Sequence, residues 1–187
     1  MSNERKNKKG HLKSRIIGYP DAEYFNRLVL ENQEKVYTLF RRMVANHADA
    51  DDLTQETFIK VYKNLAKFRQ ASSVYTWIYR IAINTGINYL RRKRARQFIG
   101  LDSIDLHAEE HSPADLRGTS SLLNQAIRNL SARQQMVIIL RSYQGLSFKE
   151  IARLMDSTEN AAKVNYSHAL KRLRTVFDQM GVDYESL

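Results

Sequence analysis

The chain of 187 residues contains no cysteine, only two prolines and only seven glycines. Without cysteine it can form neither disulfides nor thiolate metal sites, and this composition fits a reducing compartment. Its longest apolar runs, such as residues 136–140, are far too short to span a bilayer. The cations near the N-terminus are not followed by the apolar segment of a secretory signal. We therefore expect a cytoplasmic protein with no membrane insertion.

Acidic residues are scarce relative to basic ones. The chain has 30 Lys and Arg against 20 Asp and Glu, which gives a formal net charge of +10. This balance suits a polyanionic partner, although a basic surface that is merely solvated would give the same total. Residues 1–20 form a basic tail that could contact nucleic acid or only aid solubility. The clustering of the cations must decide between the two interpretations.

Hydrophobic residues recur at helical spacing along almost the whole chain, without the alternation of strands. The pattern predicts helices at about 21–45, from 49–52 to about 68, and at about 74–96. Between residues 101 and 116 five acids occur without any Lys or Arg. We expect an all-α protein of two small helical domains joined by a flexible acidic linker. The expected divisions are a basic tail at 1–20, a first domain at 21–98, the linker at 99–118 and a second domain at 119–187.

The C-terminal half contains the clearest motif, a short helix followed by a tight turn and a longer basic helix. Ser147 and Glu150 form a capping box that starts the short helix, and residues 156–158 supply the turn. In the longer helix, inward-facing positions are predicted at Ala162, Tyr166, Ala169 and Leu173. This order is typical of a helix-turn-helix, whose second helix enters the major groove of DNA. An ordinary helical hairpin with a solvated basic face is the alternative.

The segment 74–97 combines aromatic side chains with a run of cations. Aromatic planes can accept unstacked bases at about 1–3 kcal/mol each, and a cationic row can follow a phosphate backbone. Together they favour DNA that is being opened. For single aromatics such as Trp77, a place in the buried core is the stronger interpretation. The cations, which could also form only a solvated face, are Arg91, Arg92, Lys93, Arg94 and Arg96.

Two blocks of this sequence resemble a known family. Residues 49–68, DADDLTQETFIKVYKNLAKF, and 74–96 resemble region 2 of bacterial sigma-70-type factors, and residues 130–174 resemble region 4. The linker is too short for the domain that larger members carry between these regions, as in the extracytoplasmic-function (ECF) group. The resemblance covers about residues 25–177. It implies a sigma factor that binds core RNA polymerase and promoter DNA, and many such relatives are controlled by an anti-sigma factor.

The resemblance implies a polymerase-docking segment in the first domain. In the family this segment binds the coiled-coil clamp helices of the largest polymerase subunits. The residues alone leave this open, because acids near the start of a helix could merely offset the helix dipole. The matching residues are Asp51, Asp52, Leu53, Gln55, Glu56 and Phe58.

The resemblance also assigns a surface for the minus-10 element. Residues 68–73 correspond to the loop that captures a flipped base, and the helix that follows carries further contacts. The positions concerned are Phe68, Arg69, Ser72, Ser73, Tyr75, Trp77, Arg80 and Asn84, followed by the five cations from Arg91 to Arg96.

Residues 157–174 match the helix that reads the minus-35 element. The positions concerned are Ser157, Thr158, Glu159, Asn160, Lys163, Asn165, Ser167, His168, Lys171, Arg172 and Arg174. The chain departs from the common pattern here, because Lys163 is the only cation in the first turns. The family's base preferences therefore do not carry over. Asn165 could read adenine or lie against a phosphate.

A two-domain helix-turn-helix regulator acting alone is the alternative function. The sequence HAEEH at 107–111 fits the zinc-peptidase signature H-x-x-E-H. It lies in the acidic linker, two residues before Pro113, without the long buried helix that such a site requires. We therefore expect no enzyme, no metal and no cofactor.

Overall fold

The computed structural model describes residues 21–44, 46–68, 72–98, 123 and 126–180. Within these ranges every regular element is a helix, so the all-α prediction is confirmed. None of the described helices is both long and apolar enough to cross a bilayer. The predicted tail at 1–20, the linker at 99–118, Arg69 and the HAEEH sequence lie outside the described residues.

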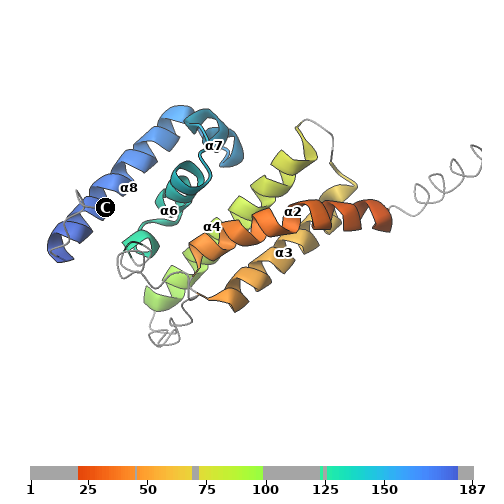
Figure 1. Ribbon diagram of the computed structural model, residues 1–187, viewed down its shortest axis with the longest axis horizontal. Helices are drawn as coiled ribbons and strands as arrows, with labels where there is room; N and C mark the ends of the chain where they lie inside the picture. The colour runs from red at the N-terminus through yellow and green to blue at the C-terminus, as the bar shows by residue number, and fades with distance from the viewer. Residues whose placement is uncertain (1–20, 45, 69–71, 99–122, 124–125, 181–187) are drawn as a thin grey trace, which may run out of the picture.

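Three long helices form an N-terminal unit, namely α2 (Ala22–Met43), α3 (His47–Leu65) and α4 (Val74–Phe98). Helix α3 packs against both α2 and α4, and α2 also contacts α4 (Figure 1). Their shared core includes the fully buried Leu39, Phe40 and Ile83. The predicted periodicity therefore corresponds to real buried faces.

The start of α3 differs from the sequence expectation. The sequence pattern predicts a cap within residues 49–52, but α3 begins at His47 and Asn46 is its N-cap. The Asn46 side chain accepts a hydrogen bond from the Asp49 backbone N–H at 2.7 Å. Asparagine is among the strongest N-cap residues, and here it competes successfully with the acids that follow. Asp49 instead accepts a hydrogen bond from the Tyr89 hydroxyl of α4 at 2.6 Å.

Residues 126–180 form a C-terminal unit. It contains α6 (Ala132–Ile138), a π-helical turn at Ile139–Tyr143, α7 (Phe148–Leu154) and α8 (Glu159–Met180). The inward-facing positions predicted for α8 are confirmed, because Ala162, Ala169 and Leu173 are buried and Tyr166 is half-buried. Asp156 in the turn before α8 adopts a positive φ of 48°, a conformation that Asp tolerates better than most residues. The helix-turn-helix geometry follows from this turn.

The two units pack directly against each other. Helix α4 contacts both α6 and α7, and α2 contacts the π-helical turn (Figure 1). Buried residues of α6 and α7, including Met136 and Ile151, belong to the same core cluster as α2, α3 and α4. This packing explains why α4 carries apolar residues on more than one face. One face covers the N-terminal unit and another receives the C-terminal unit.

The capping box of α7 is expected to contribute measurably to the stability of the protein. The Ser147 hydroxyl accepts from the Glu150 N–H at 3.2 Å, and the Ser147 N–H donates to the Glu150 carboxylate at 2.8 Å. We expect Ser147→Ala to lower the free energy of unfolding by about 1 kcal/mol, measured by urea titration. Alanine at the exposed Ser142 is the matched control and should leave stability within about 0.5 kcal/mol. Equal losses in the two variants would contradict a specific role of the cap.

Candidate nucleic-acid interface

Helix α4 presents a polar and basic stripe to solvent. Asn84, Asn88, Arg91 and Arg92 are exposed and recur at three- and four-residue steps, and the exposed Arg96 continues the row. Three of these side chains are permanently charged and two carry amides, so the stripe can bind phosphates and offer hydrogen bonds to bases. The sequence assignment omitted Asn88, although its spacing from Asn84 and Arg92 places it on the same face.

Aromatic side chains gather where α4 begins. The Phe68 and Trp77 rings lie with centroids 4.9 Å apart, and Tyr75 stacks on Tyr79 at 5.3 Å. Trp77 is half-buried, Tyr79 is buried and Tyr75 is 40% exposed, so Tyr75 is the most exposed of the three. The Lys35 ammonium lies 5.1 Å from the Tyr75 ring centroid, which adds positive charge beside that ring.

Two serines precede this aromatic group. The Ser73 hydroxyl accepts a hydrogen bond from the Thr76 N–H at 3.1 Å, so Ser73 acts as the local cap of α4. Ser73 is exposed and Ser72 is half-buried. Ser72, Ser73 and Tyr75 line the same pocket at the start of the helix.

Some cations of α4 face the C-terminal unit rather than solvent. Arg80 is half-buried, and its Nε donates to the Arg153 carbonyl oxygen at 2.7 Å. Arg94 donates to the Arg128 carbonyl oxygen at 3.4 Å. Burial, together with the charge of Arg172, lowers the pKa of Arg94. Lys93 is also half-buried. Among the predicted minus-10 cations, Arg91, Arg92 and Arg96 are thus exposed, whereas Arg80 and Arg94 are hydrogen-bonded to the C-terminal unit.

Helix α3 carries an acidic face. Asp51, Asp52 and Gln55 are exposed, whereas Leu53 and Phe58 are buried in the core. Leu53 and Phe58 anchor α3 in the core, so their side chains cannot contact a partner directly. Glu56 is partly exposed and forms two ion pairs. Its carboxylate lies 2.7 Å from the Lys60 ammonium and 3.8 Å from the guanidinium of Arg92 in α4.

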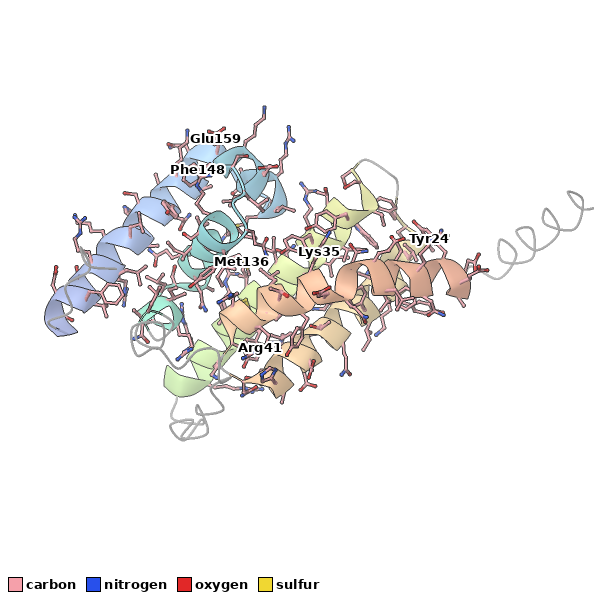
Figure 2. The ribbon with its side chains drawn as sticks, in the orientation of Figure 1. Tyr24, Lys35, Arg41, Met136, Phe148 and Glu159 are labelled. Atoms are coloured by element: carbon pink, nitrogen blue, oxygen red, sulfur yellow. The ribbon has the colours of Figure 1, made fainter. Side chains whose placement is uncertain are left out.

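Helix α8 exposes most of its predicted DNA-binding residues. Thr158 caps the helix by accepting from the Ala161 N–H at 3.1 Å. Glu159 lies at the start of α8 (Figure 2). Lys163 pairs with Glu159 at 2.8 Å, and the hydrogen bond to Lys163 is the main cause that lowers the pKa of Glu159. Asn165 is half-buried and donates to the Ala161 carbonyl at 2.8 Å, so its amide nitrogen already has a partner within the helix.

The remaining α8 positions form a continuous outer face. Ser157 is half-buried, and the exposed positions are Thr158, Glu159, Asn160, Lys163, Ser167, His168, Lys171, Arg172 and Arg174. Helix α7 adds the exposed Lys149 and Arg153, which the sequence assignment did not include. Their position in the first helix of the helix-turn-helix could have predicted a DNA contact, because this helix crosses the DNA backbone.

The described residues hold no cluster of His, Asp and Glu that could bind a metal ion. What the described surface offers instead is two basic helical faces and one acidic helical face. The basic faces suit a nucleic acid, and the acidic face suits a basic protein surface.

Comparison with protein families assigns both halves of the chain. Residues 28–96 match sigma-70 region 2, and residues 120–173 match sigma-70 region 4. These ranges contain all of α3, most of α2 and α4, and most of the helix-turn-helix.

Similar proteins agree with this assignment. The chain is 36% identical over 148 residues to the ECF RNA polymerase sigma-E factor of Haemophilus influenzae, which covers 73% of this chain and 78% of that protein. It is 37% identical over 148 residues to the ECF RNA polymerase sigma-E factor of Escherichia coli K12, which covers 73% of this chain and 77% of that protein.

Solved structures show the same fold. The sigma factor RpoE in complex with the anti-sigma factor NepR from Bartonella quintana aligns with a TM-score of 0.61 at 23% identity, over 84% of this chain and 98% of that one. CnrH in complex with the cytosolic domain of CnrY aligns with a TM-score of 0.59 at 20% identity, over 85% of this chain and 90% of that one. With the two family regions and the sigma-E relatives, the conclusion is that this chain belongs to the ECF group of sigma-70 family RNA polymerase sigma factors.

Proposed function

We propose that this sigma factor binds core RNA polymerase through α3 and directs it to promoters through α4 and α8. In this proposal α4 contacts the minus-10 element and α8 reads the minus-35 element. The chain acts in the cytoplasm and catalyses no reaction itself. The observation that carries the proposal is the presence of two exposed basic helical faces in separate units, together with a separate acidic face on α3.

The docking role falls to the exposed part of the acidic face. Asp51, Asp52 and Gln55 are available to a partner, and Leu53 and Phe58 support them from the core. The partly exposed Glu56 is bonded to Lys60 and lies near Arg92. An acidic surface on a helix fits a partner helix with basic side chains. We therefore assign direct polymerase contact to the exposed trio.

The energetics of DNA opening require the polymerase. Separating roughly ten base pairs at about 1.4 kcal/mol per step costs on the order of 14 kcal/mol. Two or three captured bases return only about 2–9 kcal/mol. The exposed Tyr75 and the half-buried Trp77 are the candidates for such capture. The free chain should therefore bind duplex DNA weakly and with strong salt dependence.

An anti-sigma factor is a further candidate partner. Both aligned solved structures are of complexes, one with an anti-sigma factor and one with the cytosolic domain of CnrY. An inhibitor of this chain would have to cover at least one of the three faces described above.

Co-elution with core RNA polymerase tests the proposal against the alternative of a stand-alone regulator. The chain and bacterial core enzyme should elute as one complex in size-exclusion chromatography. A regulator that acts alone has no need of core enzyme. Failure to co-elute, combined with tight sequence-specific binding of the free chain to duplex DNA, would favour that regulator.

Lys163 provides a test of the minus-35 assignment. It is exposed and is the only cation in the first turns of α8, and its ion pair with Glu159 is a surface pair of small energy. We expect Lys163→Ala to reduce transcription from a minus-35-dependent promoter about five- to tenfold, the equivalent of one lost charged contact. Run-off transcription by the reconstituted holoenzyme measures the loss. The exposed Lys63 of α3, replaced by alanine, is the control, and an equal loss there would contradict the assignment.

A further inference from the structure

Val164 of α8 is an apolar residue that faces directly away from the core. Its side chain is 43% exposed, whereas Leu173 of the same helix is only 6% exposed. At about 100° per residue, the spacing between these two positions puts them on opposite faces of the helix. Ala162 and Ala169 are buried on the side of Leu173. Val164 therefore takes no part in the packing of α8 against α6 and α7.

Helix formation does not account for this valine either. β-branched residues lose side-chain freedom in a helix, so alanine or lysine at the same exposed position would favour the helix more. Single exposed apolar residues are common on protein surfaces, and exposure alone therefore assigns no role to Val164. Its position on α8 is what distinguishes it.

The neighbours of Val164 on this face are polar. The exposed residues that surround it at helical spacing are Asn160, Ser167, His168 and Lys171. All four are among the residues assigned to the minus-35 element, whereas Val164 is not. Because α8 begins at Glu159, Val164 lies in its second turn, and the N-terminal turns of a recognition helix are the part that contacts base edges. The valine is therefore in the middle of the face proposed to read DNA.

The other large exposed apolar residue of α8, among those that the structure describes, is Leu170. It lines a groove together with Leu123 and Phe177, so apolar side chains of its own unit lie beside it. It also lies about 120° around the helix from Val164. Leu170 therefore belongs to a different surface and provides a matched control.

A valine side chain can recognise only an apolar group. It has no hydrogen-bond donor or acceptor, so it can bind neither a phosphate nor a polar base edge. In the major groove the base edges present hydrogen-bonding groups, and the apolar exception is the C5 methyl group of thymine. Small apolar side chains on recognition helices contact this methyl group directly. An exposed valine on the reading face therefore suits a thymine.

We propose that Val164 is a specificity-determining residue that reads one thymine of the minus-35 element, by packing its methyl groups against the C5 methyl group of that base. The inference rests on the proposed function, because it requires α8 to lie in the major groove of this element. Loss of the thymine methyl group should lower transcription about fourfold, equivalent to about 0.8 kcal/mol.

A promoter library tests which base the valine selects. A promoter transcribed by the holoenzyme of this chain would carry a short randomised stretch in place of its minus-35 element, and the templates retained in open complexes would be sequenced. We expect the wild-type holoenzyme to enrich thymine at one position. The Val164→Ala variant should lose that enrichment and keep the preferences at other positions. Leu170→Ala should keep all of them, and neither change should disturb folding because both side chains are exposed.

Deoxyuridine at the enriched position then isolates the methyl group, since it pairs as thymine does but lacks the C5 methyl. Run-off transcription by the wild-type holoenzyme should fall about fourfold, whereas the Val164→Ala holoenzyme should transcribe both templates equally. An equal penalty in both proteins, absence of thymine enrichment, or enrichment that survives Val164→Ala would overturn the inference and leave minus-35 recognition by α8 intact. A library without base preference at any position would overturn that recognition and the inference with it.

Discussion

Replacing Asp51 and Asp52 together by lysine is expected to weaken binding to core RNA polymerase by about 100-fold, equivalent to about 2.8 kcal/mol. Both side chains are exposed on α3, so the change would place two positive charges against a partner surface that suits acids. Like charges brought together at an interface cost several kcal/mol. The dissociation constant can be measured by fluorescence anisotropy of the labelled chain titrated with core enzyme.

The control for this experiment makes the same change of charge elsewhere. Glu31 and Glu34 are exposed on α2, and their replacement by lysine should leave polymerase binding within about twofold. Both double variants should unfold close to the wild-type denaturant midpoint because all four side chains are exposed. Equal weakening by the two double variants would mean that net charge, and not the α3 face, governs docking.

Neutralising the exposed stripe of α4 is expected to have a comparably large effect on DNA. The triple change Arg91→Gln, Arg92→Gln and Arg96→Gln removes three exposed cations. At about 1 kcal/mol per lost phosphate contact, affinity for DNA should fall about 100-fold. The slope of log affinity against log salt should decrease in magnitude by about 3, or one for each contact. Filter-binding titrations at salt concentrations between about 50 and 200 mM measure both the affinity and the salt slope.

A triple variant with the same change in net charge is again available. Arg27, Lys63 and Arg133 are exposed cations outside the proposed contacts, and glutamine at all three should leave the salt slope nearly unchanged. If the slope of log affinity against log salt fell equally in both triple variants, DNA binding would depend on total charge rather than on the α4 stripe.

The helices and the helix-turn-helix could be predicted because short-range patterns determine them. The capping box at Ser147 and Glu150 and the inward positions of α8 depend on residues three or four apart, and the structure confirms both. The predicted start of α3 is a few residues too late, because several residues between Asn46 and Asp52 can cap a helix and spacing alone does not rank them. Short-range patterns therefore predict which segments are helical more accurately than they predict the residue at which a helix begins.

The packing of the two units could not be predicted from the same patterns. The apolar residues of α4 on several faces indicated a second contact, but they could equally have faced a partner molecule. That contact is made by α6 and α7, which come more than 30 residues later in the chain. Such long-range contacts depend on the shapes of two finished surfaces. Gln135, which is buried between them, has no sequence signal that distinguishes it from an exposed glutamine.

The binding surfaces occupy an intermediate position. Sequence identified the acidic segment of α3, yet only the fold separates the exposed Asp52 and Gln55 from the buried Leu53 and Phe58. It likewise identified the cations of α4, whereas the fold shows that Arg80 and Arg94 are turned toward the C-terminal unit. Residue type gives the chemistry that is available, and burial decides which groups can use it.

Run-off transcription with start-site mapping tests the central claim most directly. Bacterial core RNA polymerase would be incubated with a library of bacterial promoter fragments, with and without this chain, and the 5′ ends of the transcripts would be sequenced. The account predicts a new set of start sites that appears only with the chain, shares a minus-10 and a minus-35 element, and disappears with the Asp51→Lys, Asp52→Lys variant. Start sites that are the same with and without the chain would contradict it.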